Sequence, residues 1–71
     1  MALQQKQYPL AIQYLNNGLK VDAGNLTLLE DLAETYYLSG NGQQAASIAQ
    51  QVLQRQPNSA RAQQVLSLLT Q

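Results

Sequence analysis

The side chains best suited to acid–base chemistry are four carboxylates, Asp22, Glu30, Asp31 and Glu34, and three of them are near neighbours in the chain. A helix would place Glu30 and Glu34 on one face, because they are four residues apart. Two carboxylates act as general acid and base only where a second wall of protein sets their spacing and shifts one pKa. The chain has no histidine and no cysteine, so no nucleophile and base pair accompanies these acids. We therefore expect no enzymatic activity.

Composition narrows the remaining functions. Without cysteine or histidine there are no disulfides and none of the usual zinc ligands, and we expect no metal and no cofactor. Four basic and four acidic residues give a formal net charge of zero, so neither nucleic acid nor a membrane surface is an expected partner. The sequence shows no signal peptide and no apolar run long enough to span a membrane. We expect a soluble chain, and the compartment stays open.

A chain of 71 residues forms one domain with a thin core, and apolar residues at helical spacing predict two helices in its first half. Pro9 suits the first turn of a helix, and Gly24 with Asn25 provides a stop, so the first helix is expected to run from about residue 9 to residue 21. Asn25 can cap the next helix. That helix carries an apolar stripe at Leu29, Leu32, Ala33 and Tyr36.

The second half of the chain predicts two further helices. Gly40 and Asn41 tolerate left-handed backbone dihedrals, so a short turn is expected there, with antiparallel helices on either side. Pro57 should end the third helix, and either Asn58 or Ser59 can cap the fourth. The apolar faces are Ala45, Ile48, Ala49, Val52 and Leu53 in the third helix, and Ala62, Val65, Leu66 and Leu69 in the fourth.

The strongest pattern is a set of apolar, small and proline residues that share the spacing of one known helical hairpin. The set is Leu29, Leu32, Ala33, Tyr36, Ala45, Ala49 and Pro57. At these positions the chain resembles the tetratricopeptide repeat family, whose unit is a hairpin of about 34 residues. The resemblance implies an all-α fold in which antiparallel helical hairpins stack as a short right-handed superhelix of about four helices.

The period of the repeat predicts how the single domain, residues 1–71, is divided. Residues 26–59 form one full repeat, residues 6–25 resemble the second helix of a preceding repeat, and residues 60–71 resemble the first helix of a following repeat. Residues 1–5 would be the stub of an earlier helix. We expect a section of a longer array; the alternative is a small protein whose terminal helices cap the hairpin. Leu29 and Ala49 depart from the family pattern, which has aromatic residues there.

The resemblance also implies a function, which is non-catalytic binding of a peptide or a partner helix by a scaffold of stacked hairpins. In the family the first helix of each repeat lines a concave groove. The residues expected to face that groove are Thr27, Glu30, Asp31, Glu34, Tyr37, Arg61 and Gln64. Three acids in this set favour a basic or polar ligand segment. The alternative interpretation is that these acids simply solvate an exposed helix face near its N-terminus.

A second function remains open, because several large apolar residues fall outside the predicted helical stripes. Leu10 and Tyr14 lie near one end of the chain and Leu68 lies near the other. Exposed apolar surface and zero net charge both favour association. The alternative function is therefore self-assembly into a homodimer or a swapped oligomer through exposed terminal helix faces.

Overall fold

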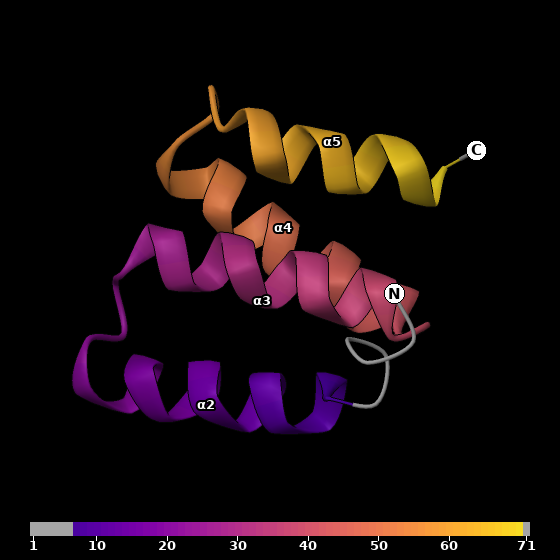
Figure 1. Ribbon diagram of the computed structural model, residues 1–71. Helices are drawn as coiled ribbons and strands as arrows, with labels where there is room; N and C mark the ends of the chain where they lie inside the picture. Colours follow the sequence, from indigo (N-terminus) through magenta and orange to yellow (C-terminus); the bar gives the residue numbers. More distant parts are fainter. Residues whose placement is uncertain (1–6, 71) are drawn as a thin grey trace.

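The computed structural model describes residues 7–70, which form four α-helices joined by short turns. These are α2 (Tyr8–Val21), α3 (Leu26–Leu38), α4 (Gly42–Arg55) and α5 (Ala60–Leu69). Successive helices run antiparallel, and no strand occurs among the described residues (Figure 1). The predicted all-α fold of helical hairpins is confirmed. The expected helix stub at residues 1–5 lies outside the described residues.

The helix α2 differs from the prediction only in where it starts. The helix begins at Tyr8, one residue earlier than expected, with Pro9 in its first turn. It ends at Val21, where the backbone N–H of Asp22 still donates to the carbonyl of Gly18, 2.9 Å away. The predicted end at residue 21 is confirmed, and Gly24 lies in the turn that follows the helix without a left-handed conformation, since the described part of the chain has a positive φ only at Gly40.

Two predicted N-caps are present, one at the start of α3 and one at the start of α5. The side-chain oxygen of Asn25 accepts from the backbone N–H of Leu28, 3.0 Å away, at the start of α3. Of the two candidate caps for α5, the structure uses Ser59, whose Oγ accepts from the backbone N–H of Ala62 at 3.2 Å. These bonds satisfy N–H groups that have no partner within the helix.

The turn between α3 and α4 follows the predicted left-handed cap at Gly40, which has a φ of 92°. The backbone N–H of Asn41 donates to the carbonyl of Tyr36 at 2.8 Å, and that of Gly40 to Tyr37 at 3.2 Å. This pair of bonds is the Schellman arrangement, which closes the last turn of a helix. Asn41 itself keeps a negative φ of −94°. The compact turn brings α4 directly alongside α3.

The buried core belongs to three of the four helices. Its members are Leu32 and Ala33 of α3, Ala45, Ala49 and Val52 of α4, and Ala62 and Val65 of α5. Alanine predominates because small side chains let two helix backbones approach closely. The helix α2 has no fully buried residue, and the apolar face that it turns toward α3 is only half-buried. A Cβ added to Gly18 of α2 would lie 2.9 Å from Leu28 Cδ1 of α3, so a glycine at this position lets the two helices lie close together.

The helix α3 is the centre of the arrangement, since it packs against α2, α4 and α5. Figure 1 shows α5 lying beside α3 and running in the same direction, with α4 behind the two. One face of the molecule is therefore lined by α3 and α5 together.

None of the helices formed by residues 7–70 is long and apolar enough to cross a membrane.

Candidate functional site

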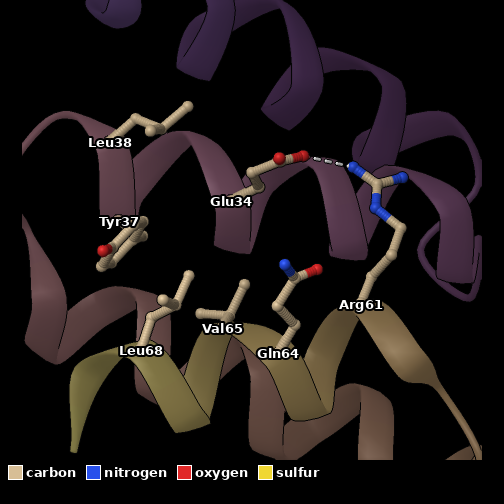
Figure 2. Close-up of a pocket in the computed structure, with 7 residues that line it drawn as sticks. All are labelled: Glu34, Tyr37, Leu38, Arg61, Gln64, Val65 and Leu68. Carbon is tan, nitrogen blue, oxygen red and sulfur yellow. Dashed lines mark hydrogen bonds and ion pairs between the residues drawn. The ribbon is translucent and has the colours of Figure 1, made fainter. Parts of the chain in front are cut away.

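A hollow of about 120 Å³ lies between α3 and α5, and we call it the α3/α5 furrow. Its lining residues are Glu34, Tyr37 and Leu38 from α3, and Arg61, Gln64, Val65 and Leu68 from α5. Figure 2 shows Gln64, Val65 and Leu68 pointing from α5 toward α3 and Arg61 reaching Glu34, with Leu38 at the outer edge of α3. Val65 is buried, whereas Glu34, Leu38, Gln64 and Leu68 are exposed to solvent.

Helical spacing explains why these residues share the furrow. Glu34 and Leu38 are four residues apart on α3, and so are Gln64 and Leu68 on α5, which places each pair on one face of its helix. Because α3 and α5 run in the same direction, their early residues meet at one end of the furrow and their late residues at the other. The furrow is consequently polar at one end and apolar at the other.

The polar end is organised by Arg61. Its Nη2 lies 2.6 Å from Asp31 Oδ1 and 2.5 Å from Glu34 Oε1, so one nitrogen joins two carboxylates of the neighbouring helix. The hydrogen bond to Glu34, and then Asp31, raises the pKa of Arg61 above its ordinary value, against the opposing effect of burial. The three side chains are 42%, 39% and 52% exposed. Exposed pairs of this kind contribute at most about 1 kcal/mol each.

A second polar link joins the start of α5 to α3. The hydroxyl of Ser59 donates to Glu30 Oε2 at 2.6 Å while it caps α5 through Ala62. Ser59 is buried, with only 3% of its surface exposed. A carboxylate at this position also suits the positive end of the α5 dipole. Glu30 therefore helps to fix α5 beside α3.

The structure divides the predicted groove residues into two groups. Glu34, Tyr37, Arg61 and Gln64 line the furrow. Asp31 and Glu30 lie outside the lining and hold Arg61 and Ser59 respectively, and Thr27 is exposed on the first turn of α3. The groove was expected to be mildly acidic. The contacts of Arg61 balance part of that charge, because its guanidinium bridges two of the three acids.

Sequence reasoning missed three lining residues, Leu38, Val65 and Leu68. Leu38 follows Glu34 by four residues, and Leu68 follows Gln64 by four, so the helical period extended from the predicted set would have found both. Leu68 had been interpreted only as exposed apolar surface at one end of the chain. Val65 had been assigned to the core, and it is both buried and part of the furrow.

A separate apolar surface lies on α2, on the far side of α3 from α5. A shallow hollow there is lined by Gln7, Leu10, Ala11 and Tyr14. Leu10 is 64% exposed and Tyr14 is 81% exposed. Covering apolar side chains that are this open to water lowers the free energy, so they mark a surface suited to association.

A family model described as Tetratricopeptide repeat matches residues 2–69. The chain therefore belongs to the tetratricopeptide repeat family, in agreement with the resemblance seen in its sequence. Members of the family typically serve as protein-binding scaffolds built from helical hairpins. Comparisons with curated proteins and with solved structures found no match.

Proposed function

We propose that this chain is a non-catalytic protein-interaction module that holds a segment of a partner protein in the α3/α5 furrow. The observation that carries the proposal is the lining of the furrow, in which exposed polar and apolar side chains from two helices face one gap. Family membership supports a protein or peptide as the ligand. A basic or polar segment is favoured by the acids of α3.

We further propose the division into one full repeat, residues 26–59, with a second helix of a preceding repeat before it and a first helix of a following repeat after it. The repeat length of about 34 residues pairs Ala11 with Ala45 and Gly18 with Val52. The residues of α4 in these pairs are buried, and their α2 counterparts are half-buried. All four residues lie on the face that their helix turns toward α3, and this correspondence supports the division.

The proposed function can be tested by selecting peptides from a displayed random library on the immobilised chain. Affinities of the enriched peptides are then measured for the Leu68→Ser variant, which replaces apolar surface at the furrow. We expect about tenfold weaker binding, because burying a leucine side chain contributes roughly 1.5–3 kcal/mol.

The matched control is Val21→Ser, which makes a similar change at a residue that is 90% exposed on α2. It should leave the affinities unchanged. The absence of enriched peptides would reject the function, and equal affinity for both variants and the unaltered chain would reject the furrow as its site. Circular dichroism of each variant verifies that the helices are intact.

A second candidate function, self-assembly, is favoured by the exposure of Leu10 and Tyr14 on α2. If self-assembly is the function, we expect this surface to pair with the same surface of a second copy of the chain. The apparent molar mass should then rise with protein concentration. Sedimentation equilibrium over a wide concentration range measures it. Leu10→Glu should then restore the monomer, and a strictly monomeric unaltered chain would eliminate this candidate.

A further inference from the structure

The two ends of the furrow differ in chemistry, and this difference specifies the ligand. The inference rests on the proposed function. Glu34, Arg61 and Gln64 form the polar end, whereas Tyr37, Leu38 and Leu68 form the apolar end (Figure 2). A ligand that fills the whole furrow must therefore present one polar and one apolar group in a fixed order.

The distance between the two ends sets the spacing of those groups. Glu34 and Leu38 are four residues apart, as are Gln64 and Leu68, and a helix rises about 1.5 Å per residue, so the ends are about 6 Å apart. In an extended chain, side chains two residues apart point to the same side and are separated by about 6.6 Å. An extended segment with its two recognised side chains at positions i and i+2 matches this spacing.

Charge decides which polar group fits. Three carboxylates, those of Glu30, Asp31 and Glu34, lie around the polar end against the single guanidinium of Arg61. Glu34 is the one that lines the furrow, and its side chain is more than half exposed. A cation placed there meets a negative excess, whereas a ligand carboxylate would be repelled.

Arg61 also affects how well a ligand cation binds at the polar end. Its Nη2 contacts both Glu34 and Asp31, so it already occupies the place that a ligand cation would take. Because these pairs are largely solvated, exchanging one cation for another costs little. Arg61 therefore competes with the ligand.

We propose that the furrow binds an extended protein segment that carries a lysine or arginine and an aliphatic residue two positions apart. The cation pairs with Glu34, and the aliphatic side chain packs against Tyr37, Leu38 and Leu68. Arg61 lowers the affinity for such segments by competing for Glu34, and it thereby selects for segments that also fill the apolar end.

The test uses the full chain, isotope-labelled for nuclear magnetic resonance, and three short peptides. The first is acetyl-Ser-Lys-Ser-Leu-Ser-amide, the second has Glu in place of Lys, and the third places Lys and Leu at adjacent positions. We expect the first peptide to bind most tightly and to shift the resonances of Tyr37, Leu38 and Leu68.

Three variants then separate the contributions. Glu34→Gln should weaken binding of the first peptide about fivefold, and Arg61→Gln should strengthen it about fivefold, as expected for exposed ion pairs. Gln50→Lys is the matched control, because it adds the same net charge as Glu34→Gln at an exposed position on α4. It should leave binding unchanged.

The inference is overturned if the Glu peptide binds more tightly and Arg61→Gln weakens it, because Arg61 would then be the ligand contact. It is also overturned if none of the peptides shifts the furrow resonances. In the first case the furrow still binds protein segments, so the proposed function stands. In the second case the function and its site both stand if the library yields peptides that lose affinity with Leu68→Ser. Enriched peptides that keep their affinity would reject the furrow as the site, and the absence of enriched peptides would reject the function as well.

Discussion

Ser59 is the residue at which helix capping and helix-to-helix packing coincide. Its hydroxyl donates to Glu30 on α3 and accepts from the backbone N–H of Ala62 on α5. Since Ser59 is buried, water does not readily replace either bond. The start of α5, and with it Arg61, is therefore positioned by one serine.

We predict that Ser59→Ala lowers the free energy of unfolding by about 1–2 kcal/mol, because it removes a cap and a bond to a charged group. Urea denaturation measures this. Ser47→Ala, at an exposed position in the middle of α4, is the control, and it should raise the free energy of unfolding slightly, by about 0.5 kcal/mol or less, because alanine is a better helix former than serine. Equal stability of the two variants would show that the Ser59 bonds contribute nothing.

At the scale of the elements, the turn from α3 to α4 depends on one backbone conformation. Gly40 has a φ of 92°, and a Cβ added there would meet nothing within 4 Å. Any cost of a side chain at this position therefore comes from the backbone rather than from a clash.

We predict that Gly40→Ala lowers the free energy of unfolding by about 1–2 kcal/mol, the cost of a left-handed conformation for an L-residue. D-alanine at position 40, introduced by chemical synthesis, has the same atoms and favours positive φ. It should instead stabilise the chain by about 0.4–1 kcal/mol, because it restricts the unfolded state. If both alanines destabilise the chain equally, backbone strain is not the cause. Chemical denaturation of the two synthetic chains makes the comparison.

Helix ends were predictable from sequence where the cause is local. Asn25, Gly40 and Ser59 act through bonds to residues three or four positions away, and all three have the predicted roles. The contact between Gly24, in the turn after α2, and a distant part of the chain could not be predicted from local patterns. An added Cβ there would lie 2.9 Å from Nη1 of Arg55.

The candidate site, too, was predictable from sequence only where the cause is local. Helical period and family resemblance identified Glu34 and Gln64 as surface residues on the correct helices. The bridge from Arg61 to Asp31 and Glu34 could not be read from sequence. It exists because α5 lies beside α3, which is a consequence of packing between residues about 30 positions apart.

At the scale of the whole molecule, the packing is uneven. Among the described residues, the buried apolar side chains all belong to α3, α4 and α5, while α2 is attached through a half-buried face. Hydrophobic stabilisation follows the apolar area removed from water. The free energy of unfolding is therefore supplied mainly by α3, α4 and α5, of which α3 and α5 line the furrow.

The central position of α3 links ligand binding to folding. Because α3 packs against every other described helix and also supplies one wall of the furrow, a ligand that needs this wall intact binds only the folded chain. At a free concentration of ten times its Kd, it would add about 1.4 kcal/mol to the free energy of unfolding. That raises Tm by roughly 5–10 °C for a domain of this size. A partner can thus be sought by heating the chain with candidate segments.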